Sequence, residues 1–226
     1  MSYAALLTQV PLFENLPPEE VHHLSSLVHT HRYSRGEVIF HRGDVGTTLH
    51  IIRKGQVSIR LTSSDGKEVI LSLLNRGDVY GELALLDGAP RSTDAVAREE
   101  ADVLQLQRGD FQRYLATRPQ VALGLLATLS RQVRQITQLV HDTTFLDARA
   151  RVQRVLLNLA QHLGRPEGTG VAITQKFTQT ELASLCGLTR ESTNKWLRTF
   201  VREGSVSYDG GALKLLRPDL FRREAE

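Results

Sequence analysis

Residues 81–93, with the sequence GELALLDGAPRST, bring together groups that could bind an anion and a hydroxyl. Arg91 carries a permanent planar charge that suits a phosphate. A glycine followed by a short helical turn offers free backbone N–H groups, which also attract anions. Glu82 repels phosphate, so its natural partner is a hydroxyl such as a ribose 2′-OH. The two together indicate a nucleotide, although an ordinary β-turn with a surface Glu–Arg pair fits the same spacing.

A second group lies near the C-terminus, where the pattern predicts two short helices. Thr178 and Glu181 have the spacing of a capping box, so a helix should start there. Gly187 should end that helix, and Thr189 should cap a second one over Arg190–Arg202. Two helices joined by so short a turn form a helix-turn-helix. The hairpin predicted from the residues that follow, 205–216, would be the wing of a winged helix.

The polar face of the second predicted helix suits DNA. In a helix-turn-helix, the N-terminal residues of the second helix meet base edges. Arg190 and Lys195 suit guanine and Glu191 suits cytosine, whereas Arg198 and Lys176 suit phosphates. The predicted DNA-binding residues are Lys176, Thr189, Arg190, Glu191, Thr193, Asn194, Lys195 and Arg198. An ordinary charged helix surface is the alternative.

Length and composition exclude several classes of protein for the chain that carries these groups. The 226 residues suffice for one large or two modest domains. Residues 147–226 carry 13 basic and 9 acidic side chains, so the net positive charge of +3 lies in the last third and favours a polyanion partner there. The single cysteine, Cys186, excludes an internal disulfide and a protein-only four-thiolate metal site. No secretory signal or run of 18 apolar residues is visible, so we expect a cytoplasmic protein without membrane spans.

The sequence around residues 81–93 predicts a helix followed by a β-rich segment, and these elements would position the first group of residues. Apolar residues at helical spacing predict a helix around residues 18–28. Short β-rich runs with intervening glycines then fill residues 33–107, and Asp65-Gly66 is a strong hairpin signal. The predicted strands are Glu37–Phe40, Leu49–Arg53, Gln56–Thr62, Lys67–Leu74 and Asp102–Gln107. A jelly roll of about eight strands fits this length.

A long helix is predicted over Pro119–Asp142. Its apolar residues step by four and three in the sequence Ala122, Leu126, Leu129, Val133, Ile136 and Val140. This narrow heptad seam favours a parallel dimer over a helix packed only on its own barrel, which is the alternative. Asp147 should cap the next helix, and residues 164–170 should form an exposed loop. In the helix predicted over Arg190–Arg202, Trp196, Leu197 and Phe200 should face inward.

These motifs, in this order, resemble the cyclic-AMP receptor protein and fumarate–nitrate regulator family of bacterial transcription factors. Gly81–Ser92 is similar to the family's phosphate-binding cassette, and Thr189–Lys195 is similar to its recognition helix. Residues 145–147 resemble its hinge. The resemblance implies an α+β chain: an N-terminal β jelly-roll cyclic-nucleotide-binding domain over residues 1–118, a coiled-coil dimer helix and hinge over 119–146, and a winged helix-turn-helix over 147–226.

The resemblance also implies roles and partners. Gly81, Leu83 and Ser92 would bind the cyclic phosphate of cyclic AMP with Arg91, and Glu82 would hold the ribose. The base would rest against the dimer helices, where the family's cyclic-AMP-responsive members place two hydroxyl residues. Here the pair is Ile136-Thr137, so only Thr137 is left for that contact. The implied partners are a second copy of the chain, double-stranded DNA with a TGTGA-like palindrome, and RNA polymerase.

Two alternatives stay open. The same architecture could respond to another nucleotide or bind DNA without a ligand, as the Ile136 departure suggests. A cupin-like metalloenzyme is the distant alternative, because His29, His31 and Glu37 superficially resemble a cupin metal motif, though with the wrong spacing. These two histidines, with His22, His23 and His41, are expected on a helix and loop surface. We therefore predict no enzyme activity, no catalytic residue and no metal ligand.

Overall fold

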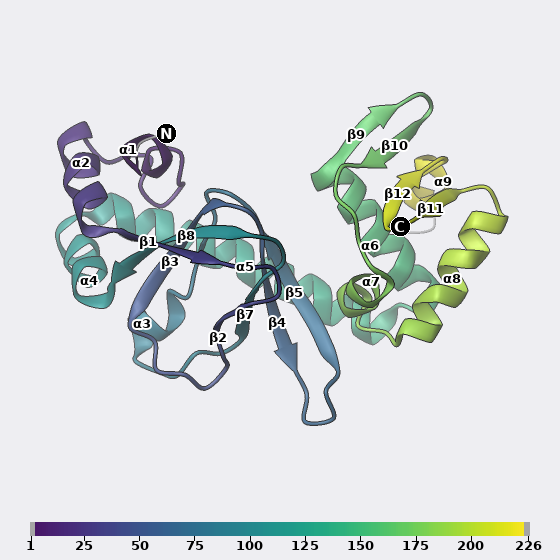
Figure 1. Cartoon of the computed structure of the whole chain (residues 1–226), viewed down its shortest axis with the longest axis horizontal. Helices are drawn as coiled ribbons and strands as arrows, with labels where there is room; N and C mark the ends of the chain where they lie inside the picture. The colour runs from purple at the N-terminus through teal and green to yellow at the C-terminus, as the bar shows by residue number, and fades with distance from the viewer. Residues whose placement is uncertain (1–2, 224–226) are drawn as a thin grey trace. The chain divides into compact units, whose positions relative to one another are not determined.

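The computed structural model describes residues 3–223, with the side chains of residues 222 and 223 left out of the description. Figure 1 shows the helices and strands in chain order. The chain divides into two compact units. The first holds the chain up to Thr62 together with Leu71–Ile136, and the second holds Ser63–Ile70 and the chain from Thr137 onward.

The β-rich segment forms two four-stranded sheets, which matches the predicted roll of about eight strands. One sheet has the order β1-β8-β3-β6 and the other the order β2-β7-β4-β5. Their bounds are β1 His29–Tyr33, β2 Val38–Phe40, β3 Thr48–Lys54, β4 Val57–Thr62, β5 Glu68–Leu74, β6 Val79–Tyr80, β7 Asp94–Ala97 and β8 Ala101–Gln107. The Asp65-Gly66 hairpin is confirmed, with the Ser63 N–H donating to the Lys67 carbonyl at 2.9 Å.

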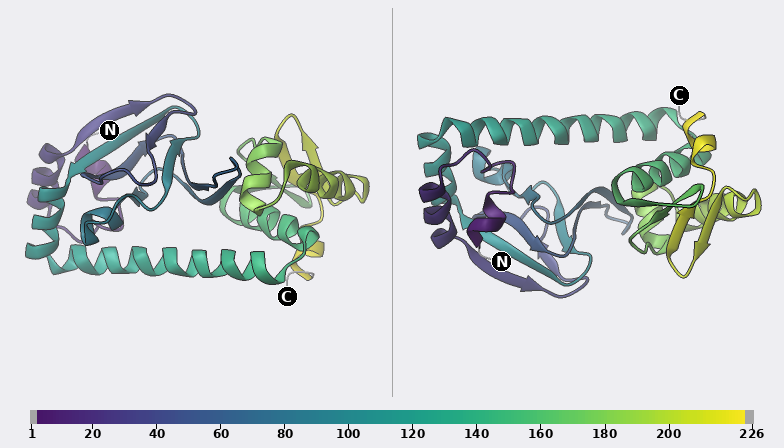
Figure 2. Two further views of the ribbon diagram at one scale, coloured as in Figure 1. Left: turned by 90° about the horizontal axis from the view of Figure 1, so that it is seen from below. Right: turned by 90° about the horizontal axis from the view of Figure 1, so that it is seen from above.

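Helices pack at one end of this roll and complete its core (Figure 2). They are α1 (Tyr3–Leu7), α2 (Pro18–Leu27) and α4 (Arg108–Thr117). Leu24 of α2 and Phe111 of α4 are fully buried in one apolar cluster with Leu104 of β8. Fully burying such a side chain stabilises the fold by about 1.5–3 kcal/mol. The same cluster takes in Val121 and so fixes the start of the long helix against the sheet.

The long helix, α5, spans Pro119–Phe145 and is continuous (Figure 2). It begins where predicted and ends three residues later. Val121 and Leu125 turn into the core of the first unit, whereas four of the six seam residues face outward. These four, Leu126, Val133, Ile136 and Val140, are 59%, 62%, 50% and 57% exposed. Leu129 is half-buried against the core, so the helix packs on its own barrel through a face that borders the seam and includes this one seam residue.

The second unit contains α6 (Ala148–Leu163), α7 (Gln179–Cys186), α8 (Arg190–Arg202) and α9 (Pro218–Arg223). The Asp147 cap is confirmed, since its carboxylate accepts from the Ala150 N–H at 2.8 Å. A four-stranded sheet has the order β11-β12-β10-β9, with bounds β9 Gly164–Glu167, β10 Gly170–Ile173, β11 Val206–Asp209 and β12 Ala212–Leu215. The β11–β12 hairpin is the predicted wing.

Two sequence predictions about local structure are wrong. Residues 164–170 are not a loop, because β9 pairs with β10 and β10 pairs in turn with β12. His29 and His31 lie in strand β1 and not on a helix or loop, because their backbone pairs with β8. The prediction for α8 is confirmed for Leu197 and Phe200, which are buried, while Trp196 is half-buried and stacks on Phe200 with ring centroids 6.5 Å apart.

Candidate functional site

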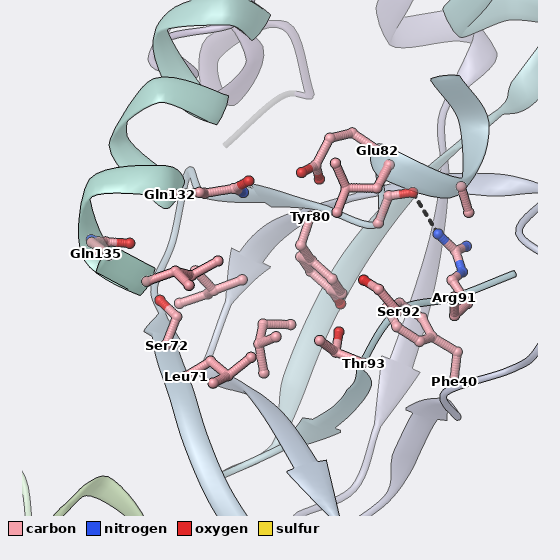
Figure 3. Close-up of a pocket in the computed structure, with 16 residues that line it drawn as sticks. Phe40, Leu71, Ser72, Tyr80, Glu82, Arg91, Ser92, Thr93, Gln132 and Gln135 are labelled. Carbon is pink, nitrogen blue, oxygen red and sulfur yellow. Dashed lines mark hydrogen bonds between the residues drawn. The ribbon is translucent and has the colours of Figure 1, made fainter. Parts of the chain in front are cut away.

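A pocket in the first unit brings the predicted cassette together with strands of the roll and with α5 (Figure 3). Gly81, Glu82 and Leu83 line it, together with Arg91 and Ser92. The other lining residues are Phe40, Ile59, Leu71, Ser72, Leu74, Tyr80, Ala84, Thr93, Gln132, Gln135 and Ile136. Five of the six cassette and base-contact residues named from the sequence thus share one cavity.

The cassette owes its shape to a glycine and a short helix. Gly81 has φ +81°, and a Cβ there would lie 2.6 Å from the Arg91 Nη1 atom, so a side chain at this position would collide with the guanidinium. The short helix α3 (Leu83–Asp87) follows directly. Its first N–H groups have no partner within the helix. Leu83, the first residue of α3, is 44% exposed and lines the pocket.

Arg91 is buried beneath this turn and is held by the backbone. Its Nη1 donates to the Gly81 carbonyl at 2.5 Å and its Nη2 donates to the Thr48 carbonyl at 2.8 Å. The guanidinium also lies over the Phe40 ring at 4.3 Å, while its Nε is buried without a hydrogen-bond partner. Burial lowers the pKa of Arg91, and the carboxylate of Glu82 opposes that shift. The Arg91 guanidinium is thus a cation held in one orientation, and its Nε is a donor without a partner.

Glu82 provides the opposite charge from the end of the same turn. Its side chain is 3% exposed and points toward α5, where it accepts a hydrogen bond from Gln132 (Figure 3). Burial raises the pKa of Glu82, while hydrogen bonds from its own backbone and from Gln132, and the charge of Arg91, lower it. A desolvated carboxylate benefits from further donors, and sugar hydroxyls are donors of that kind.

Behind the turn lies an aromatic cluster that sequence reasoning missed. His50 stacks on Tyr80 with ring centroids 5.0 Å apart and contacts Phe40 at 5.5 Å. Burial lowers the pKa of His50 to about 3, and the charge of Arg91 acts in the same direction. The imidazole is therefore neutral near pH 7, so it adds no charge to the cassette.

The other end of the pocket is largely apolar and is closed by α5. Ile59, Leu71, Leu74 and Ile136 form its walls. Gln132 and Gln135 are the polar groups that α5 adds, and the sequence analysis had not assigned either of them to the site. The spacing of Gln132 four residues before Ile136 could have placed it on the same face. Thr137 is exposed on α5 and is not among the lining residues.

The predicted helix-turn-helix is present in the second unit as α7 and α8. The Thr178–Glu181 capping box is complete, with the Glu181 N–H donating to Thr178 Oγ1 at 3.1 Å and the Thr178 N–H donating to the Glu181 carboxylate at 2.7 Å. Gly187 ends α7 at φ +60°. Thr189 caps α8 by accepting from the Ser192 N–H at 3.2 Å.

Six of the eight residues predicted to contact DNA are exposed, and three of them, Glu191, Lys195 and Arg198, lie on one exposed side of α8. Arg190, Glu191, Lys195 and Arg198 are exposed on α8, and Thr189 and Lys176 are exposed before α8 and α7. Thr193 differs, because it is 0% exposed on the same face as Leu197 and Phe200, so its side chain cannot reach a ligand of that exposed side. Asn194 is half-buried and donates to Gln179 at 2.7 Å.

The last buried group of note is Cys186. Its side chain is 3% exposed, and burial raises the pKa of its thiol to about 12. A protonated thiol is neither a nucleophile nor a metal ligand. The residue fills space at the end of α7. Among the residues that the structure describes, no group of three or more His, Cys, Asp or Glu side chains could hold a metal ion.

Comparisons with known proteins match both groups of residues. Residues 30–118 match the family model for a cyclic nucleotide-binding domain, and residues 150–224 match that for a Crp-like helix-turn-helix domain. The cyclic AMP receptor protein of Thermus thermophilus is 34% identical over 215 residues, which cover 95% of this chain and 96% of that protein. The chain belongs to the CRP family of transcription regulators.

Two further comparisons agree with that family. The CRP-like cAMP-activated global transcriptional regulator of Mycobacterium tuberculosis is 30% identical over 97% of this chain and 98% of its own length. The structure of the c-di-GMP responsive global regulator CLP of Xanthomonas campestris shares the fold, with a TM-score of 0.76 at 23% identity, covering 84% of this chain and 94% of that one. These CRP-family relatives are transcription regulators and not enzymes, as the sequence predicted. The cupin-like alternative is therefore dropped.

Within the described chain, no helix combines the length and the apolar character needed to cross a membrane.

Proposed function

We propose that this CRP-family regulator works as a cytoplasmic homodimer whose binding to a palindromic TGTGA-like site is gated by cyclic AMP. The cassette pocket carries the proposal. It places one buried cation, one buried carboxylate and an apolar compartment around a single cavity. Those groups match the phosphate, the ribose hydroxyl and the base of a cyclic nucleotide in turn.

Each cassette residue has a distinct part in this proposal. Arg91 binds the cyclic phosphate through the Nε donor that has no partner and through the two groups it now directs at carbonyls. Gly81, Leu83 and Ser92 complete the phosphate site. Glu82 accepts from the ribose 2′-OH beside Gln132.

The exposed seam of α5 supports the dimer. Four seam residues of the isolated chain are at least half exposed, so a second copy would bury a continuous apolar stripe. Thr137 lies four residues after Val133 and three before Val140, so it borders this stripe. In a dimer built on the seam, Thr137 faces the partner, and its contact with an effector is made across the interface.

The second unit supports DNA reading and suggests how α5 affects it. Arg190 and Lys195 donate to guanine and Glu191 accepts from cytosine, while Lys176, Thr189 and Arg198 contact the backbone. Arg151 of α6 donates to the carbonyls of Thr143 and Leu146 in and just beyond the last turn of α5, and to that of Gly187 in the turn before α8. A change at the end of α5 therefore acts on the helix-turn-helix through one side chain. Contact with RNA polymerase completes the proposed role.

A second candidate is the same regulator with another nucleotide effector. Ile136 in the pocket favours it, because an apolar side chain stands where a hydroxyl would bind adenine. Recognition of the polar edge of the nucleotide's base would then depend on Gln135 and Ser72.

One titration separates these candidates. The full chain is added to a fluorescently labelled TGTGA/TCACA palindrome at fixed salt, with and without cyclic AMP, and anisotropy is recorded. A rise in affinity of about 100-fold with cyclic AMP is the expected result. Tight binding that cyclic AMP leaves unchanged would reject cyclic AMP as the effector. Absence of binding in both arms would reject the TGTGA-like site.

A further inference from the structure

Gln179, the first residue of α7, lies against the start of α8 and accepts hydrogen bonds from two of its side chains. Its Oε1 atom accepts from Arg190 Nε and Arg190 Nη2, both at 3.3 Å, and from Asn194 Nδ2 at 2.7 Å. Arg190 and Asn194 are four residues apart and so lie on one side of α8. One amide oxygen of the first helix thus joins two side chains of the second.

The orientations in this group are fixed by donor and acceptor chemistry. A guanidinium can only donate, so Gln179 must turn its oxygen toward Arg190. The Asn194 amide must then present its nitrogen to the same oxygen. This leaves Asn194 Oδ1 buried without a hydrogen-bond partner. A buried acceptor without a partner is unfavourable, so the contact with Gln179 outweighs that cost.

The contact leaves a defined part of Arg190 for a ligand. Gln179 occupies the edge formed by Nε and Nη2, whereas the end formed by Nη1 and Nη2 points away from it. That end carries two parallel donors, which match the O6 and N7 acceptors of guanine. Arg190 is exposed, so without Gln179 its long side chain would sample several rotamers and lose entropy on ordering.

We propose that Gln179 is a positioning residue that sets base specificity by holding Arg190 in the rotamer that reads guanine. The inference rests on the proposed role of Arg190 as a base reader. Gln179 itself contacts no base, and Asn194 supports it from the same side of α8. Its effect is on discrimination between base pairs and not on general affinity for DNA.

The test compares variants of the full chain on a pool of sequence-randomised duplexes, with bound sequences read out at two salt concentrations. Gln179→Met keeps the length of the side chain and removes the acceptor. Gln179→Glu keeps an acceptor at the same place. Arg190→Ala, alone and with Gln179→Met, completes a double-mutant cycle. Gln161→Met on the exposed surface of α6 is the matched control for the chemical change.

We expect Gln179→Met to lower discrimination at one base pair by about three- to tenfold, with affinity for the unselected pool changed less than about twofold. Arg190→Ala should lose discrimination at the same base pair, and adding Gln179→Met should cost nothing more. Gln179→Glu should keep the discrimination while lowering affinity for all sequences, because it adds a negative charge facing phosphates. Gln161→Met should behave as the unaltered chain, and all variants should melt within a few degrees of it.

Three results would overturn the proposal. Unchanged discrimination in Gln179→Met would show that Arg190 needs no support. An equal loss for all sequences, with an unchanged salt dependence, would make Gln179 a neutral phosphate contact. Full additivity in the double variant would show that the two residues act independently. If Arg190→Ala alone leaves every base preference intact, the reading role proposed for Arg190 fails instead, and that outcome is distinct from the other three.

Discussion

Placing a carboxylate on the α5 seam should separate the proposed dimer, and Val133→Asp is the sharpest such change. Val133 is 62% exposed in the single chain and lies mid-way along the seam. Burying a valine fully is worth about 1.5–3 kcal/mol, so the exposed part contributes roughly 1–2 kcal/mol per copy. Two copies face each other across a twofold axis, which makes the loss on the order of 2–4 kcal/mol.

The new carboxylates add a second unfavourable contribution, because two like charges would be desolvated opposite each other. The combined loss corresponds to a dimer weakened by at least about 100-fold. Sedimentation velocity over a range of protein concentrations measures it directly. Arg134→Asp is the control, because Arg134 is exposed on α5 next to the seam but not part of it.

We expect Val133→Asp to be monomeric at concentrations where the unaltered chain and Arg134→Asp are dimeric. Its affinity for a palindromic duplex should fall while its affinity for a single half-site stays the same, since only the linkage between the two reading units is lost. A Val133→Asp dimer of undiminished stability would show that the seam is not the interface.

Four other changes test the pocket and the helix-turn-helix. Arg91→Gln should weaken cyclic AMP binding by at least about tenfold in calorimetry, because a charge-assisted contact to phosphate is lost; unchanged binding would place the phosphate elsewhere. Glu82→Gln should also weaken binding, yet it should raise the melting temperature more at pH 7 than at pH 4.5: burial raises the pKa of Glu82, so its stabilising protonated form is lost as pH rises. A melting difference independent of pH would contradict this sign. Thr178→Ala should cost about 1 kcal/mol in denaturant unfolding by removing the capping-box acceptor, and a loss near zero would mean that the box is redundant. Cys186 should resist a thiol reagent at pH 8 in the folded chain and react after unfolding, because burial raises its thiol pKa to about 12; rapid labelling of the native chain would refute that burial.

The parts of the fold that depend on local chemistry could be predicted from the sequence. The caps at Asp147, Thr178 and Thr189 each place an oxygen within reach of backbone N–H groups two or three residues on, which spacing alone reveals. The heptad seam of α5 could be predicted because it too is defined by the spacing of residues along the chain. These features need no knowledge of what packs against them.

Features that depend on distant partners were missed. Strand β1 has the sequence His-Thr-His-Arg-Tyr, which shows no apolar alternation, because four of its five side chains are exposed and its pairing with β8 defines it. Thr193 was placed on the polar face by residue type, whereas its spacing with Leu197 and Phe200 makes it part of the core. Gln132 lines the pocket only because α5 packs across the pocket at this residue, which depends on the tertiary structure. The pocket could thus be predicted from its cassette but not from its α5 wall.

The hydrogen bonds that hold Arg91 have a consequence for how sensitive the regulator is to its effector. Nη1 and Nη2 of the guanidinium already donate to the Gly81 and Thr48 carbonyls, and only Nε lacks a partner, so a phosphate that draws on all three nitrogens competes with two backbone acceptors. The affinity of the site for a phosphate then depends on the difference in free energy between the hydrogen bonds to the phosphate and those to the two carbonyls. Substitutions that tilt the Thr48 carbonyl would raise or lower the concentration at which the regulator responds, without touching any atom that contacts the effector. In the proposed function, the response threshold is therefore adjustable from strand β3, which carries Thr48.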